Sequence, residues 1–309
     1  MGKPESIMSD FTIITSFFRD SGHLIRNMKT VRRFNPNSDY EWILIDNSSG
    51  GEDFHIIKDE KFTIYKGIEE KYIQPLFLKK VSAANAISLN FGITKTNTRF
   101  ICVMDPDFFI IYPNWIDAVL SYMNEAAVGI LSAPYHPMWY EKAHRATGHF
   151  MVIDTDFVPK ALLDFTPALD DFDPNNKERP KWMGKRRNLR RFNDCGSQIE
   201  NRFGNEMEYL VPLVDVGPNL KISKFDKTTD KFLPKKWRLT HIDYPVVSAR
   251  VSGILAAAEG YYWRGSLFAI HLRRYGQSLM GRDPRKTDDK VDEVLNQIYA
   301  GYRNILEAK

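Results

Sequence analysis

Short runs of apolar and β-branched residues recur along the first half of the chain and limit its fold more than any other feature. Helical spacing of apolar residues fills two of the gaps between the runs, from Leu24 to Phe34 and from Ala83 to Ile93. Buried strands that alternate with helices predict an α/β fold whose mostly parallel sheet is covered by helices on both faces. The predicted strands lie at residues 11–17, 42–46, 62–65, 100–105, 128–131 and 149–153.

The second half of the chain is less regular. Residues 164–191 mix proline, asparagine and charges, which predicts a long surface loop. Residues 235–275 return to an ordered, aromatic-rich pattern, and apolar positions from Val291 to Leu306 mark one face of a C-terminal helix.

Two acidic residues stand where predicted buried strands end. Asp46 closes the run 42–46, and Asp105 closes the run 100–105. Ligands of parallel α/β sheets bind beyond the carboxyl ends of the strands. The sequence therefore places both acids at the edge where a ligand would bind.

Composition narrows the class of protein. The 309 residues suffice for one large or two smaller domains, and the net charge of +4 is too small to predict nucleic-acid binding. Two cysteines predict no disulfide framework and favour a reducing compartment. Residues 1–10 lack the apolar core of a signal peptide, and no run approaches the ~18–20 apolar residues of a membrane span. We expect a soluble, cytoplasmic protein.

Basic residues gather between Lys177 and Arg191, where eight Lys or Arg accompany one Glu. The simplest interpretation is a solvated loop. Three functional interpretations stay open: a lid over a phosphate ligand, a handle for an anionic acceptor, or a peripheral contact with a membrane surface.

Asp105-Pro106-Asp107 is the sharpest motif. Two carboxylates one residue apart, just past a buried strand, can face one cation, and the intervening proline stiffens the turn. Mg²⁺ and Mn²⁺ prefer such oxygen ligands and bind them together with substrate phosphates. The alternative is a turn with solvated acids.

The order of motifs resembles the glycosyltransferase A (GT-A) fold, especially its family 2-like enzymes. Residues 45–50, Ile-Asp-Asn-Ser-Ser-Gly, are similar to the Asp-rich end of the second strand of that family. Ala84-Asn85 and residues 89–93 are similar to the helix that precedes the metal motif, and residues 103–107 match a strand that ends in the Asp-x-Asp (DXD) motif. The resemblance covers roughly residues 11–155, about half of the chain.

The resemblance implies roles for individual residues. Nucleotide-binding residues would be Thr15, Ser16, Asp46, Asn85 and Asp105, with Thr15 and Ser16 beneath the base and Asp46 hydrogen-bonded to it. Asp105 would contact the ribose or the metal, and Asp107 would bind the metal. The sequence departs from the family pattern at Asn47, where many members have a second acid.

Gly148 and His149 resemble the strand that lines the sugar pocket after the metal motif. A glycine there would let the backbone approach a ligand closely. The alternative is the ordinary start of a strand.

Asp194 is the candidate catalytic base. Inverting transfer requires a carboxylate to deprotonate the acceptor hydroxyl, and Asp194 matches the place of that acid in related enzymes. The alternative is a helix N-cap. Other acids remain as rivals, namely Asp170, Asp171, Glu206 and Glu208.

His271 ends an apolar run and precedes Arg273 and Arg274. A late histidine often completes the metal site in glycosyltransferases of this fold, and imidazole is a suitable ligand for Mn²⁺. The two arginines would then neutralise the leaving diphosphate. The alternatives are a buried core histidine, or His241 in this role.

These observations together predict a metal-dependent glycosyltransferase that uses Mn²⁺ or Mg²⁺. It would move a sugar from a UDP- or GDP-sugar to a glycan or other hydroxyl acceptor, with inversion expected from the resemblance. We expect a donor-binding half at 1–155, an acceptor-binding and catalytic half at 156–275, and a helical extension at 276–309. A sugar nucleotidyltransferase and a non-catalytic nucleotide- or sugar-binding module remain as alternatives.

Overall fold

The structure is a computed structural model of the chain. It describes the following residues: 10–18, 21–48, 62–68, 83–134, 146–166, 195–214, 258–264 and 266–272, together with the isolated positions 292, 295, 296 and 300.

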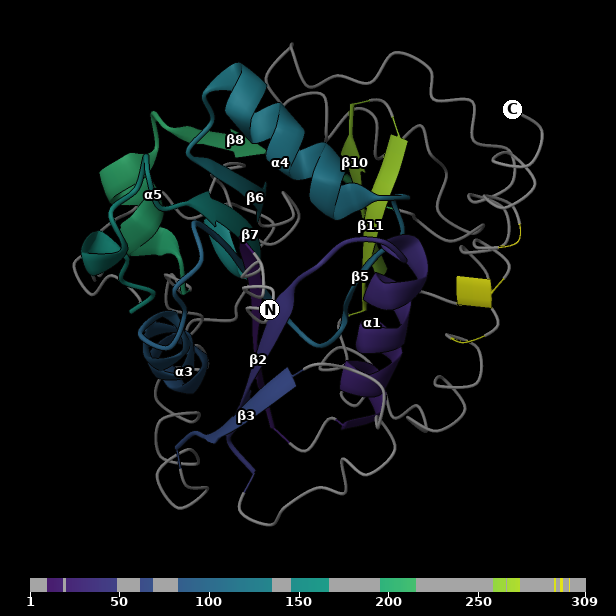
Figure 1. Cartoon of the computed structure of the whole chain (residues 1–309), viewed down its shortest axis with the longest axis horizontal. Coiled ribbons are helices and arrows are strands. Elements are labelled where there is room, and N and C mark those ends of the chain that lie inside the picture. The colour runs from purple at the N-terminus through teal and green to yellow at the C-terminus, as the bar shows by residue number, and fades with distance from the viewer. Residues whose placement is uncertain are drawn as a thin grey trace, which may run out of the picture.

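A seven-stranded sheet forms the centre of the molecule, with strand order β3-β2-β1-β4-β7-β6-β8 (Figure 1). Strand β7 runs antiparallel to its neighbours β4 and β6, and the other pairings are parallel. The predicted mostly parallel sheet is thus confirmed. The strands are β1 (Phe11–Phe17), β2 (Glu41–Asp46), β3 (Phe62–Lys66), β4 (Phe100–Met104), β6 (Ile130–Pro134), β7 (Ala146–Asp154) and β8 (Met207–Tyr209).

Both faces of the central strands are buried because successive residues of these strands point into different cores. On β4, Cys102 and Met104 belong to a core with α1 and α4, whereas Ile101 and Val103 pack in a second core with α3 and α5. Figure 1 shows α1 and α3 on opposite sides of the sheet. The helices are α1 (Ser21–Phe34), α3 (Ala83–Ile93), α4 (Trp115–Ala126) and α5 (Ser197–Phe203). The predicted layers of helices are therefore present on both faces.

A second, four-stranded sheet has the order β5-β11-β10-β9, and each of its pairings is antiparallel. It joins the first half of the chain to the second, because β5 follows directly after the Asp105-Pro106-Asp107 turn and pairs with β11. Its strands are β5 (Phe108–Ile110), β9 (Val211–Val214), β10 (Ala258–Trp263) and β11 (Ser266–Leu272).

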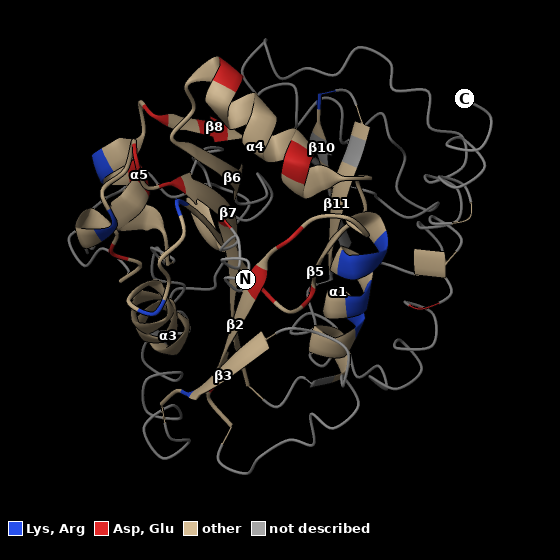
Figure 2. Ribbon diagram, in the orientation of Figure 1, with Lys and Arg blue, Asp and Glu red and all other residues tan. Residues whose placement is uncertain are grey.

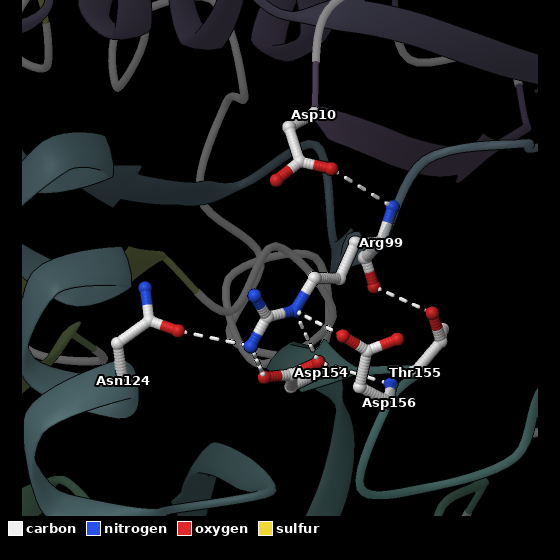
Figure 3. Close-up of polar contacts among 6 residues, drawn as sticks. All are labelled: Asp10, Arg99, Asn124, Asp154, Thr155 and Asp156. Carbon is white, nitrogen blue, oxygen red and sulfur yellow. Dashed lines mark hydrogen bonds and ion pairs between the residues drawn. The ribbon is translucent and has the colours of Figure 1, made fainter.

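A polar cluster joins strands at the edge of the main sheet opposite to Asp105 (Figure 3). Arg99, just before β4, donates from Nε and Nη2 to both carboxylate oxygens of Asp154, at 3.0 and 2.7 Å. Arg99 Nη2 also donates to Asn124 of α4, and Arg99 Nε lies 2.9 Å from Asp156. Asp154 is fully buried. Ionic contacts of Arg99 therefore stabilise this edge of the sheet, whereas the candidate site lies at the opposite edge.

Helix α1 carries several Lys and Arg residues, drawn in blue in Figure 2. Two of them contact the C-terminal part of the chain: Arg26 Nε lies 2.8 Å from Asp292 Oδ1, and Arg33 Nη1 donates to Asn296 Oδ1 at 2.9 Å. Residues 292, 295, 296 and 300 are helical, and Leu295 is buried in the core beside α1. The helical pattern predicted for the C-terminus thus packs against α1 at residues 292, 295 and 296.

Two further expectations concern membrane-spanning helices and surface loops. Within the described parts of the chain, no helix has the length and hydrophobicity needed to cross a membrane. The basic segment Lys177–Arg191 lies outside the described residues, as do most of the loop predicted at 164–191 and the boundaries predicted within 275–309.

Candidate functional site

The Asp105-Pro106-Asp107 motif forms a tight turn between β4 and β5. The N–H of Phe108 donates to the carbonyl oxygen of Asp105 at 3.1 Å, which closes a four-residue turn with Pro106 in its second position. Proline suits that position because its fixed φ matches the turn. Asp105 N–H also donates to His149 C=O at 2.9 Å. The motif is therefore fixed to β7 as well as to its own strand.

A buried asparagine from α1 clamps this turn. Asn27 Nδ2 donates to the carbonyl oxygens of Asp105 and Phe108, at 3.1 Å each. Asn27 is fully buried, and a buried polar group with such partners is costly to remove. The amide thus holds the two ends of the turn together from the helix that packs beneath it.

The small sheet brings His271 to the motif. Phe108 of β5 lies opposite His271 of β11 in the antiparallel register, and Ile111 N–H donates to Phe268 C=O at 2.9 Å. As a result, His271 Nε2 lies 3.4 Å from Asp107 Oδ1. One possible ligand atom from each of Asp105, Asp107 and His271 lies within 4.8 Å of the other two. The structure brings together the three predicted metal ligands.

Nearby histidines favour the ionised form of Asp107. Burial acts to raise the pKa of Asp107, but the charge and hydrogen bond of His271 and the charge of His23 outweigh it, so the pKa lies below its ordinary value. The side chain of Asp107 remains 16% exposed. Its carboxylate is therefore available to a cation at neutral pH.

The donor atoms fit a hard or borderline divalent cation. Two carboxylates and one imidazole suit Mn²⁺, and the carboxylates alone suit Mg²⁺. Neither of the described cysteines, Cys102 and Cys195, belongs to the cluster of possible ligand atoms. The described residues therefore do not form a thiolate-rich zinc site.

Asn85 of α3 reaches the same edge. Its Nδ2 donates to Asp105 Oδ1 at 3.4 Å and to Cys195 Sγ at 3.6 Å. Its buried Oδ1 has no hydrogen-bond partner among the described residues. An acceptor left in this state beside Asp105 suits a ligand that brings a hydroxyl group.

The ends of β1 and β2 carry the remaining predicted nucleotide-binding residues. Asp46 is partly exposed and accepts from Ser48 N–H at 2.7 Å. Ser16 is buried and accepts from Asn47 Nδ2 at 3.0 Å. Thr15 is fully buried, and its hydroxyl accepts from Trp42 Nε1 at 3.1 Å. The Thr15 side chain therefore belongs to the core beneath the strand end, and a contact with a nucleotide would have to use its backbone.

The hydrogen bonds of Asn47 give a physical reason for an asparagine at this position. It is buried, it donates to Ser16, and its Oδ1 accepts from Ser88 Oγ and Ile68 N–H at 2.9 Å each. One amide thus ties together β1, α3 and the chain after β3. A second acid at this position would lack the N–H that Ser16 receives.

Gly148 and His149 lie at the start of β7, beside Asp105. A Cβ at Gly148 would lie 2.4 Å from Cys195 Sγ, so the glycine makes room for the turn before α5. His149 is buried between Thr147, Tyr261 and His271. That these residues line a sugar pocket stays a prediction.

Several predicted site residues lie outside the described residues: Asp194, Arg273, Arg274, His241, Asp170 and Asp171. The N-cap of α5 is Gly196 in a left-handed conformation, at φ 101°. Of the rival acids, Glu206 precedes β8 and so lies at the edge opposite to Asp105. Glu208 accepts from the phenol of Tyr122 on α4.

Sequence reasoning missed two polar residues of α1. His23 and Asn27 are both buried and lie four residues apart, so they share one face of the helix. That face also carries Leu24, Met28 and Val31. The available signal was the presence of polar side chains on the core-facing side of an amphipathic helix. In the structure, both residues act on the Asp105-Pro106-Asp107 turn.

Comparisons with known proteins extend this description. No family model matches the chain, and no curated protein sequence matches it. Among solved structures, the mannosyltransferase PcManGT from Pyrobaculum calidifontis, in complex with GDP-Man and Mn²⁺, is 12% identical with a TM-score of 0.35. S. aureus TarS in complex with UDP is 9% identical with a TM-score of 0.36. The matches cover 48% and 50% of this chain and 45% and 49% of the other two chains. The chain thus aligns with about half the length of each.

Proposed function

We propose that the chain is a divalent-metal-dependent glycosyltransferase that moves a sugar from a nucleoside-diphosphate sugar to a hydroxyl acceptor, with inversion. The observation that carries this proposal is the group of Asp105, Asp107 and His271, whose possible ligand atoms lie within 4.8 Å of one another. The group stands at the carboxyl end of β4, and ligands of parallel α/β sheets bind at that edge.

Asp107 and His271 would hold Mn²⁺ or Mg²⁺, and Asp105 would bind either the cation or the ribose. When bound, the cation offsets the charge that builds on the departing nucleoside diphosphate. Arg273 and Arg274, which follow β11 in sequence, would pair with the diphosphate.

Residues at the neighbouring strand ends would bind the nucleotide. Asp46 and Ser16 lie at the ends of adjacent strands, and Phe17 faces Asp46 in their register. Asn85 offers its buried Oδ1 to a ribose hydroxyl. Asp46 would then accept from the base, which suits the ring N–H of uracil or guanine and leaves the choice between UDP and GDP open.

Asp194 would act as the catalytic base and deprotonate the acceptor hydroxyl. General-base assistance is worth about 10²–10⁴-fold in rate. Asp194→Asn should therefore bind donor and metal normally and transfer sugar at least ~10²-fold more slowly. Normal turnover per folded molecule would remove Asp194 from this role and direct the search to Asp170 and Asp171.

The proposal is tested by incubating the chain with a panel of UDP- and GDP-sugars, with Mn²⁺, with Mg²⁺ and with chelator. Release of nucleoside diphosphate from one donor, only with metal, is the expected result. Binding without any turnover would favour the non-catalytic module. Formation of a nucleotide sugar from a sugar phosphate and a nucleoside triphosphate would favour a nucleotidyltransferase, whose usual Gly-rich basic loop is poorly matched by residues 17–22.

A further inference from the structure

The ring of His271 is enclosed by other aromatic rings. It stacks on the ring of His149, with centroids 4.6 Å apart and planes inclined by 18°. Phe108 lies against both rings, with centroids 5.7 Å from each. His149 and His271 are 5% and 6% exposed. A side chain packed in this way has few orientations, and the one observed directs Nε2 towards Asp107.

His149 is itself held by two hydroxyl groups. Thr147 Oγ1 contacts Nδ1 of the ring and lies 3.0 Å from Nε2, and the hydroxyl of Tyr261 lies 3.1 Å from Nε2. Both hydroxyls also donate to backbone carbonyl oxygens, Thr147 to Ala133 at 3.1 Å and Tyr261 to Pro134 at 3.3 Å. Each hydroxyl has one hydrogen to donate. When that hydrogen goes to the carbonyl oxygen, the hydroxyl accepts from a ring N–H of His149, and these contacts restrict the ring.

We propose that His149 is a positioning residue that sets the ring orientation of the metal ligand His271 through this stacked contact. The proposal rests on the proposed metal site. It differs from a role in a sugar pocket, because both nitrogen atoms of His149 already contact Thr147 or Tyr261. It differs from a role as a fourth ligand, because the cluster of possible ligand atoms contains Asp105, Asp107 and His271 but not His149.

The contact should matter for affinity because residues that orient metal ligands typically contribute about 10–100-fold to metal binding. Without the stacked ring, His271 would have to give up rotational freedom when the cation binds. Strands β7 and β11 belong to different sheets, so the stacked pair also couples the main sheet to the small sheet at the site.

The test is a double-mutant cycle on Mn²⁺ affinity, measured by calorimetry or by electron paramagnetic resonance of free Mn²⁺. We expect His149→Leu to weaken Mn²⁺ binding about 10–100-fold and His149→Phe, which keeps a stacked ring, to weaken it less. In a His271→Ala background, His149→Leu should have little further effect, because a residue that acts through His271 has nothing left to position. Additive losses in the two variants would overturn the proposal.

Two further variants separate positioning from general stability. Tyr261→Phe and Thr147→Val keep the shape of the side chains but remove the acceptors of His149, so both should change the visible spectrum of the Co²⁺-loaded protein. Thr12→Val is the matched control, because it removes a buried hydroxyl pair with Thr98, 2.8 Å apart, near the other edge of the sheet. It should lower the unfolding midpoint without altering Mn²⁺ affinity or the Co²⁺ spectrum.

The outcomes also separate this proposal from the proposed function. Failure of the wild-type protein to bind Mn²⁺ would contradict the metal site itself. The stacked contact would then still be tested by imidazole resonances of labelled histidine, where His149→Leu should shift and broaden those of His271. Unchanged His271 resonances, or an unchanged Mn²⁺ affinity of His149→Leu in a protein that binds Mn²⁺, would overturn the positioning role.

Discussion

His271 Nε2 lies 3.4 Å from Asp107 Oδ1, although more than half of the chain separates the two residues. The pairing of β5 with β11 produces this contact, because Phe108, the residue after Asp107, lies opposite His271. The candidate site therefore depends on the small sheet as much as on the main one. A variant that loosens the β5–β11 pair should damage the site even when the main sheet remains intact.

Loss of either side chain should strongly weaken metal-dependent nucleotide binding. Asp107→Ala and His271→Ala each remove one donor from the cluster, and Asp107 is partly exposed, so that its truncation costs little core packing. Calorimetry with UDP and GDP, with and without Mn²⁺, provides the measurement. Glu125→Gln, an exposed acid on α4, is the matched control and should bind as the wild type does. Equal nucleotide affinity in all four proteins would contradict the metal site.

Asn27→Ala should weaken Mn²⁺ binding about 10–100-fold, because the amide clamps the turn that carries both carboxylates. It should also lower the free energy of unfolding by about 1–3 kcal/mol, since buried carbonyl groups lose a donor.

Asn35→Ala is the control for this variant. Asn35 is also fully buried beside α1, where it donates to Val31 O and accepts from Ile116 N–H. Its loss should cost a similar free energy of unfolding and leave Mn²⁺ affinity unchanged. If both variants bind Mn²⁺ equally well, the clamp serves the fold alone.

The elements with a clear hydrophobic period, and the mostly parallel sheet that they imply, were readable from the sequence, whereas the pairing of the small antiparallel sheet was not. The predicted bounds of β1 and α3 agree with the structure because hydrophobic periodicity is a local signal. Helix α4 was missed although Trp115, Ile116, Val119 and Met123 repeat at helical spacing and are all buried. Strand β5 was missed because three residues after a turn carry too short a pattern.

The residues of the candidate site also differ in how far a local sequence pattern identifies them. Asp105 and Asp107 were identified because they follow a buried strand in sequence. His271 was proposed from the resemblance to a family, since no local pattern relates β11 to β5. The stacking of His149 on His271 was not predicted, because the two rings come from strands of different sheets. Asn47 appeared only as a departure from a motif, and its hydrogen bonds to three segments give the physical reason.

Ionisation of Tyr122 should report on its contact with Glu208 at alkaline pH. Burial, followed by the hydrogen bond and charge of Glu208, raises the pKa of Tyr122 to about 12. A group whose pKa is raised on folding contributes stability that is complete below its unfolded pKa of about 10 and is lost as the pH rises through the folded value. The stability difference between wild type and Tyr122→Phe should therefore shrink between about pH 10 and 12. A constant difference across that window, in urea unfolding series, would contradict the contact.

Variants of Arg99 test whether the edge of the sheet opposite to Asp105 serves stability alone. Arg99 contacts both oxygens of the fully buried Asp154 carboxylate, and the Arg99 side chain is 32% exposed. Removing one partner of a buried pair leaves an uncompensated charge and typically costs 3–5 kcal/mol. Because water reaches Arg99, we expect Arg99→Ala to lower the free energy of unfolding by about 3 kcal/mol, the lower end of that range.

The controls for Arg99 follow from its geometry. Arg99→Lys keeps the charge but loses the paired contact with two oxygens, so its loss should be intermediate. Asp156, with a side chain 67% exposed, forms the outer contact of Arg99, and Asp156→Asn should cost about 0–1 kcal/mol. All three variants should retain wild-type Mn²⁺ and nucleotide affinity when measured well below their unfolding midpoints, because Asp154 and Asp105 lie at opposite edges of the sheet. An Arg99→Ala protein that unfolds at the wild-type urea concentration would show that water, rather than the guanidinium, satisfies Asp154. One that is stable but binds no Mn²⁺ would show that the two edges are coupled through β4.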